Sequence, residues 1–337
     1  MLKRVRDVRG VRPCYRNDVA NFMRDVDASG VASRYPGQKK IHRRNYHSHG
    51  PNDTWHIDGN DKLKFFGMWI HLCIDGFSRR LLWLKVGTSN RKQKFVARYF
   101  YDTVVKEGGC PKIIRSDRGK ENLVVGQMQI AFQVRQLGEQ AWQAFRMGTS
   151  VRNQRAESFN SMLKRTWTKK WLTRFEGMIE ADLLKLDNPV HINCLQYTHL
   201  RLLQEELDLE QRLWNTHDIR KQHHAPGPFG KPDVLYITPL PGFVNMLCQV
   251  EPDLLHYASH FICDMDEQLL VSNEEFRCLC GTILEGFWFP HTVNGCLAAY
   301  MKLVDELMMW MNRNGAQTPS TFAEANELYK TMLRERE

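Results

Sequence analysis

The chain lacks the long apolar stretches that would carry it into or across a membrane. None of its hydrophobic runs approaches the roughly 18 residues that a membrane-spanning helix needs, although hydrophobic residues make up 42% of the 337 positions. The first residues, Met1–Asp7, are mostly charged and hold no apolar core of a secretory signal. We therefore expect a protein with a packed core of its own and no membrane partner.

A disulfide framework, internal repeats and low-complexity segments are also missing. The nine cysteines are an odd number and lie far apart in a chain too long for a disulfide-stapled miniprotein. This pattern favours a reduced, intracellular compartment.

Positively charged residues are scarce in residues 245–337. The net charge is +9, but residues 245–337 hold 14 acidic residues against six Lys and Arg, which leaves about +17 for residues 1–244. A basic body favours a polyanionic partner such as nucleic acid. A soluble protein that merely has a basic pI fits the charge equally well.

Residues 1–50 are interpreted as a basic, irregular N-terminal segment. Its cations cluster shortly before Pro51, at Arg34, Lys39, Lys40, Arg43 and Arg44. Such a cluster is typical of an arm that contacts DNA or of a nuclear localisation signal, and also of a solvated linker.

Hydrophobic periodicity predicts an α/β domain over residues 51–236. Strands are expected at 54–58, 67–75, 81–86 and 112–117, with a helix at 94–106 before the last of them. Three meander strands, a helix and a strand are the opening order of an RNase H-like mixed sheet with flanking helices. Helices are expected between 119 and 148, from 151 towards 184 and at 193–214, and the acidic region 245–337 is expected to be mostly helical and separate in character.

Three acidic residues stand in settings that predict a shared site. Asp58 and Asp117 end expected strands, and Glu157 lies near the start of a polar helix. Converging carboxylates repel one another unless a cation lies between them, and hard oxygen ligands select Mg²⁺ or Mn²⁺. Such a site suits phosphoryl transfer. Asp75 ends the second strand and could face the same site, but it is interpreted as a turn-capping residue. Glu121 could be a substitute third ligand, but a surface turn is favoured because Asn122 follows it.

Four ordered motifs carry a resemblance to a known family. They are Trp55–Asp58, Ile74–Arg79, Ser116–Gly119 and Asn153–Asn160. Together they resemble the integrase core of retroviral integrases and related DDE transposases. The resemblance covers about residues 51–236 and closes with Trp214–His217 and Gly230–Tyr236.

The resemblance implies a metal-dependent DNA-cutting and DNA-joining activity. Asp58, Asp117 and Glu157 would be the catalytic, metal-binding triad, holding two Mg²⁺ (or Mn²⁺) ions that activate water or a DNA 3′-hydroxyl for attack on a phosphodiester. The protein would act on DNA in the nucleus as a homo-oligomer, with no small-molecule cofactor.

Cations crowd the helix that carries Glu157 and are expected to contact the DNA backbone. The candidate DNA-binding residues are Arg152, Arg155, Asn160, Lys164, Arg165, Lys169 and Lys170, together with Lys39, Lys40, Arg43 and Arg44 of the N-terminal segment. Trp167 and Trp171 lie among them and are expected to face the core.

The chain departs from the family pattern in two respects. The 39 residues between Asp117 and Glu157 are more than retroviral integrases usually have, and Cys14 is the only cysteine before Asp58, so the family's amino-terminal zinc-binding motif is missing. Two alternatives therefore stay open: a domesticated, non-catalytic DNA-binding protein on the same scaffold, and an RNase H-like nuclease for RNA–DNA hybrids.

Overall fold

A computed structural model gives the structure of residues 16–34, 48–89, 92–148, 153–221, 227–264, 267–287 and 291–335. The chain divides into two units, Met1–Tyr46 and His47–Glu337. The cations Lys39, Lys40, Arg43, Arg44 and Arg152 lie outside the described residues.

The first unit is not irregular throughout. Residues 16–34 form two helices, α2 (Arg16–Val26) and α3 (Ala28–Arg34), so the expectation of an irregular segment was wrong there. Phe22, Met23 and Val26 recur at helical spacing along α2, and their side chains are exposed. Because charged residues flank these three apolar positions, hydrophobic periodicity alone does not indicate the helix.

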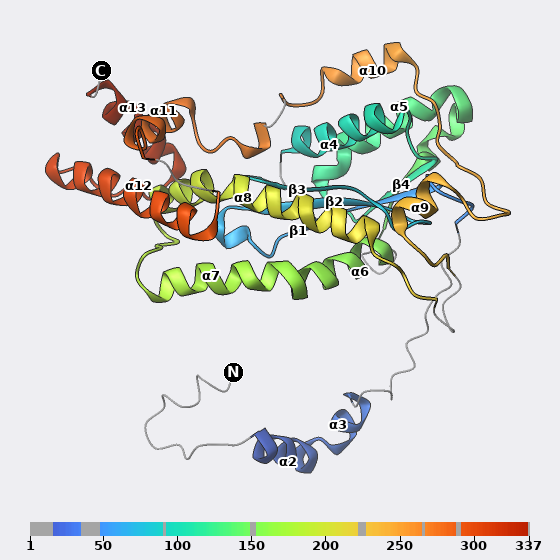
Figure 1. Cartoon of the computed structure of the whole chain (residues 1–337), viewed down its shortest axis with the longest axis horizontal. Helices are drawn as coiled ribbons and strands as arrows, with labels where there is room; N and C mark the ends of the chain where they lie inside the picture. Colours follow the sequence, from blue (N-terminus) through green and yellow to red (C-terminus); the bar gives the residue numbers. More distant parts are fainter. Residues whose placement is uncertain are drawn as a thin grey trace. The chain divides into compact units, whose positions relative to one another are not determined.

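The second unit is built on a five-stranded mixed sheet (Figure 1). Its strands are β1 (Thr54–Asn60), β2 (Trp69–Asp75), β3 (Leu81–Gly87), β4 (Ile113–Ser116) and β5 (Phe145–Met147), in the order β3-β2-β1-β4-β5. The first three strands pair in antiparallel fashion, whereas β4 runs parallel to β1 and β5 runs parallel to β4. This is the predicted RNase H-like arrangement. The three-residue β5 was not foreseen.

Helices cover both faces of the sheet. On one side lie α4 (Gln93–Glu107) and α5 (Leu123–Leu137); on the other lie α6 (Gln154–Leu163), α7 (Lys169–Glu180) and α8 (Pro189–Thr216) (Figure 1). Short helical turns complete the core domain: η1 (Lys64–Phe66), η2 (Lys120–Asn122), η3 (Gly138–Ala144) and the π-helix η5 (Lys164–Thr168).

The predicted alternation of apolar and polar side chains along β1 determines which face of the sheet carries the polar residues. Trp55 and Ile57 are fully buried in the core beneath α4 and α5. Successive side chains of a strand point to opposite faces, so His56 and Asp58 point to the face that α6 covers. Contacts of α6 with β1 and β2 confirm this arrangement.

The acidic C-terminal region is helical, as expected, and it packs on the core domain. The core domain ends with α9 (Pro232–Ile237), and the helices of the acidic region are α10 (Pro252–Ser259), η6 (Glu267–Leu269), α11 (Glu274–Ile283), α12 (Val293–Arg313) and α13 (Phe322–Arg334). Tyr300 and Tyr329 are buried with residues of α8 in one core cluster. Their hydroxyls also meet His191 Nδ1 at 2.8 Å and Asn193 Nδ2 at 3.0 Å. This region therefore packs against the N-terminal half of α8.

No helix of the described residues combines the length and the apolar composition that crossing a membrane would require.

Candidate active site

The register of the two central parallel strands brings Asp58 and Asp117 together. Thr54 pairs with Ile113 and His56 with Arg115. Carrying the same offset two residues further sets Asp58 level with Asp117, just beyond the end of β4. Because registered residues on neighbouring strands point to the same face, both carboxylates lie on the face covered by α6.

The turn after β4 holds the second carboxylate in place. The Gly119 N–H donates to Asp117 Oδ1 at 3.2 Å, and Asn122 Nδ2 lies 3.4 Å from the same oxygen. The backbone of η2 follows directly. Asp117 is thus oriented by local contacts of the segment that the Ser116–Gly119 motif opens.

Asn153 fastens the start of α6 to β1. Its Nδ2 donates to the carbonyl of Ile57 at 2.8 Å, and its Oδ1 accepts from His56 Nδ1 at 2.7 Å. Burial lowers the pKa of His56 to about 3, so the imidazole is neutral and its proton is placed on Nδ1 by this bond. The Glu157 N–H donates to the Asn153 carbonyl at 3.1 Å, which puts Glu157 one helical turn beyond the attachment.

The three carboxylates share one electrostatic environment. Burial raises the pKa of Asp58 to about 7, the negative charge of Asp117 adds to the rise, and the charge of Glu157 adds further. A hydrogen bond from Asn160 Nδ2 to Asp58 Oδ2, at 2.7 Å, opposes the shift. A buried carboxylate flanked by two others costs free energy that a cation between them would relieve.

The donor set fits Mg²⁺ or Mn²⁺ in its chemistry, because it offers carboxylate oxygens only. Among the described residues, however, no three His, Cys, Asp or Glu side chains lie close enough together to hold an ion.

Two further acids behave differently from each other. Asp75 is buried and accepts from the Asn52 N–H, the Ser78 N–H and the Ser78 hydroxyl at 2.7–2.8 Å, so it caps the turn after β2 as expected. Glu121 lies at the margin of the site: burial and then the charge of Asp117 raise its pKa. Both readings made from the sequence, a surface turn and a substitute third ligand, fit this partly buried position near Asp117.

Not all candidate DNA-binding residues present a free side chain. Lys164, Arg165 and Lys169 are exposed and form no ion pair with a described residue, whereas Lys170 pairs with Glu206 at 3.2 Å. The Asn160 amide donates to Asp58 and accepts from Asn60 Nδ2 at 2.9 Å, which commits it to the carboxylate site.

The two tryptophans among these cations are buried, as expected. Trp167 is 2% and Trp171 0% exposed. Both indole N–H groups donate to Glu206 Oε2, at 2.8 and 2.7 Å. The tryptophans are thereby fixed in the core while Lys164, Arg165 and Lys169 point to solvent.

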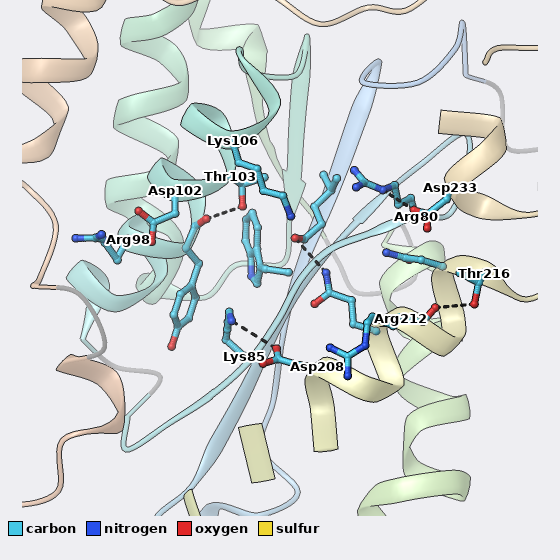
Figure 2. A pocket seen from close by; sticks show the side chains of 15 residues that line it. Arg80, Lys85, Arg98, Asp102, Thr103, Lys106, Asp208, Arg212, Thr216 and Asp233 are labelled. Atoms are coloured by element: carbon cyan, nitrogen blue, oxygen red, sulfur yellow. Dashed lines mark hydrogen bonds and ion pairs between the residues drawn. The ribbon is translucent and has the colours of Figure 1, made fainter. Parts of the chain in front are cut away.

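A pocket of about 710 Å³ lies elsewhere, along β3 between α4 and α8 (Figure 2). Its acids are paired with its cations: Arg80 with Asp233 at 2.7 Å, Lys85 with Asp208 at 3.6 Å and Arg98 with Asp102 at 2.8 Å. None of the three candidate catalytic carboxylates lines it. We therefore do not assign the catalytic site to this pocket.

The comparison with protein families decides what this arrangement belongs to. The model of the integrase core domain matches residues 45–235, which is more than half of the chain. The chain belongs to the integrase core domain family. The integrase core domain is a member of the RNase H-like polynucleotidyl transferase superfamily, and its family function is DNA integration. No curated protein matched the chain.

Proposed function

We propose that this integrase core domain cuts and joins DNA phosphodiesters, using divalent ions held by Asp58, Asp117 and Glu157. The observation that supports the proposal is geometric: the register of β1 and β4 sets Asp58 level with Asp117, and Asn153 attaches the start of the helix that carries Glu157 to β1. The raised pKa of Asp58, to which the charges of Asp117 and Glu157 contribute, agrees with this arrangement.

The strands, the helix and the exposed cations of the site would each have a separate role in this activity. β1 and β4 place Asp58 and Asp117, and α6 brings Glu157 over them. Asn160 orients the Asp58 carboxylate through its hydrogen bond. Bound Mg²⁺ or Mn²⁺, two ions in our proposal, would neutralise charge on the attacking and leaving oxygens. The exposed cations Lys164, Arg165 and Lys169 would contact the DNA backbone, which supplies affinity without sequence choice.

The test uses the purified full chain, labelled duplex DNA and Mn²⁺. We expect nicked or joined products from the unaltered protein and none from Asp117→Asn, which keeps the size of the side chain and removes its charge. Asp253→Asn is the matched control, because Asp253 is an exposed aspartate in the first turn of α10. Full activity of the Asp117→Asn protein would remove the assignment of the triad.

A non-catalytic DNA-binding scaffold is the second candidate. It is favoured by the spacing of the carboxylates, since no three potential ligands of the described residues are close enough to hold an ion. This candidate predicts DNA binding that weakens steeply with salt, together with no cleavage in Mg²⁺ or Mn²⁺. Cleavage of RNA–DNA hybrids but not of duplex DNA would instead identify a hybrid nuclease.

Assembly and location are part of the same proposal. We expect a homo-oligomer, because joining of DNA ends requires more than one end to be held. We also expect the protein in the nucleus, where its proposed DNA substrate lies. Light scattering of the purified protein and imaging of the tagged full chain test these two points separately.

A further inference from the structure

A second pocket, of about 470 Å³, lies beside α6. It is enclosed by the turn after β2, by α6, by the end of α8 and by the chain that follows α8. Arg155 and Ser158 of α6 line it. Residues two apart on a helix lie on nearly opposite sides, so α6 presents Glu157 towards Asp58 and Arg155 towards this pocket.

Positive charge dominates the pocket wall. Three arginines line it, Arg79, Arg155 and Arg220, against the single aspartate Asp218. Arg220 and Asp218 are exposed, whereas Arg79 is partly buried. Burial, and then the charge of Arg155, lower the pKa of Arg79 to about 10, which leaves the Arg79 guanidinium charged at neutral pH. Two guanidinium groups that lie close together and are partly shielded from water favour an anion between them.

The backbone of Arg79 is held in a conformation that arginine seldom adopts. Its φ is +65°, in the left-handed region where Gly or Asn is accommodated more easily. Two hydrogen bonds fix this conformation: the Arg79 N–H donates to the Asp75 carbonyl at 3.0 Å, and Trp214 Nε1 donates to the Arg79 carbonyl at 2.7 Å. An arginine at such a position directs a charged side chain into the pocket at a cost in backbone strain.

The guanidinium of Arg79 retains unused hydrogen-bonding capacity. One of its Nη groups donates to the Pro228 carbonyl, and its Nε is buried without a partner among the described residues. Buried donors without partners are uncommon. Guanidinium donors match the oxygens of a phosphate group in geometry as well as in charge.

We propose that the pocket lined by Arg79, Arg155 and Arg220 binds a backbone phosphate of DNA. The inference rests on the proposed function only for the identity of the polymer, and it does not require the carboxylates to be catalytic. The pocket and Asp58 lie on opposite sides of one helix, a separation of about 10 Å. A DNA strand whose phosphate occupies the pocket would therefore pass close to the carboxylate site.

The experiment measures binding of a labelled DNA duplex by the full chain in EDTA, between about 50 and 200 mM salt. Three variants are compared with the unaltered protein: Arg79→Gln, Arg220→Gln and the control Arg313→Gln. Arg313 is an exposed arginine at the end of α12 and does not line the pocket. Each pocket variant removes one of the cations that neutralise the bound phosphate, so the slope of log affinity against log salt should fall, by at most about 0.9.

The affinity of Arg79→Gln should also fall about tenfold, the loss expected for one charge-assisted hydrogen bond. Arg313→Gln should leave affinity and slope unchanged. Since Arg220 is exposed, Arg220→Gln gives the answer even if Arg79→Gln folds poorly. An unchanged slope in Arg220→Gln and in folded Arg79→Gln overturns the proposal.

Two further arms separate the sources of the ligand and the two proposals. Inorganic phosphate, compared with chloride at equal ionic strength, should raise the melting temperature of the unaltered protein more than that of Arg79→Gln. Stabilisation by phosphate without any change in the DNA slopes would mean that the pocket takes a free phosphate, which refutes the DNA assignment. Binding in EDTA does not depend on cleavage, so an absence of cleavage by the unaltered protein would refute the proposed function and leave the pocket assignment standing.

Discussion

Replacing Asp58 by asparagine should stabilise the protein while abolishing the proposed activity. The carboxyl has an ordinary pKa of 3.8 and a folded-state pKa of about 7. Between these values the folded state holds the proton more tightly than the unfolded state does, so stability falls as the pH rises through this window. At one pKa unit per ~1.4 kcal/mol, the ionised carboxylate costs the folded state about 4 kcal/mol above pH 7.

An asparagine side chain in place of Asp58 would avoid this cost and keep the local geometry. Its carbonyl oxygen replaces Asp58 Oδ2 as the acceptor for Asn160 Nδ2. We therefore expect Asp58→Asn to exceed the unaltered protein in free energy of unfolding by up to about 4 kcal/mol at about pH 8, and to match it below about pH 4, where the carboxyl is protonated in both states.

Urea unfolding in EDTA at about pH 8 and about pH 4 measures this difference directly. A saturating divalent cation should reduce the difference at the higher pH, because ligand binding stabilises only the protein that holds the ion. Equal or lower stability of Asp58→Asn at the higher pH in EDTA would refute the inference that Asp58 is buried among like charges.

Three other substitutions test how the site and its support are held. Glu206→Leu leaves the indole N–H groups of Trp167 and Trp171 without an acceptor and should lower the free energy of unfolding by about 2–5 kcal/mol, whereas Glu206→Gln keeps one acceptor oxygen and should cost about 1 kcal/mol, both measured by urea unfolding. Asn153→Ala removes both side-chain bonds between α6 and β1, so melting should show a loss of about 2–4 kcal/mol, and DNA cleavage should fall even where the variant stays folded. Asp75→Ala deprives three donors of their acceptor and should be clearly less stable than Asp75→Asn at neutral pH, while the ratio of cleavage rate to folded protein stays unchanged in both, since Asp75 caps a turn.

The parts of the site that sequence could predict are those set by local pattern. The alternation of Trp55 and Ile57 with His56 and Asp58 determined the face of β1 on which the first acid lies, and the structure confirms it. The adjacency of β1 and β4 was indicated by the RNase H-like order of three meander strands, a helix and a strand, and the structure confirms it.

Other parts depend on contacts between residues far apart in the chain. His56 and Asn153, whose bond fixes the start of α6, are 97 residues apart, and no spacing rule connects them. β5 has three residues, too few to show a period of two, and it forms because β4 offers a parallel edge. The spacing already placed Glu121 near Asp117, whereas the influence of Glu157 on Asp58 depends on the packing of α6 against β1.

The outer edge of β3 limits how the proposed homo-oligomer can be built. Edge strands present unpaired N–H and C=O groups that readily pair with another chain. Here side chains of α8 occupy them: Asn215 Oδ1 accepts from the Leu81 N–H at 2.8 Å, and Gln204 Oε1 accepts from the Val86 N–H at 2.9 Å. Gln204 Nε2 donates in turn to the Leu84 carbonyl at 3.1 Å.

Gln211, which lies between them on α8, donates from Nε2 to the Leu81 carbonyl at 3.1 Å. The side-chain amides of these three residues of α8 take the place of the partner strand that β3 lacks. A second copy would have to displace buried hydrogen bonds in order to extend the sheet at this edge, and each displaced group would need a new partner. Self-association of this chain should therefore use helical or loop surfaces. An open β3 edge would permit a continuous sheet across two copies, but the amide side chains of α8 disfavour it.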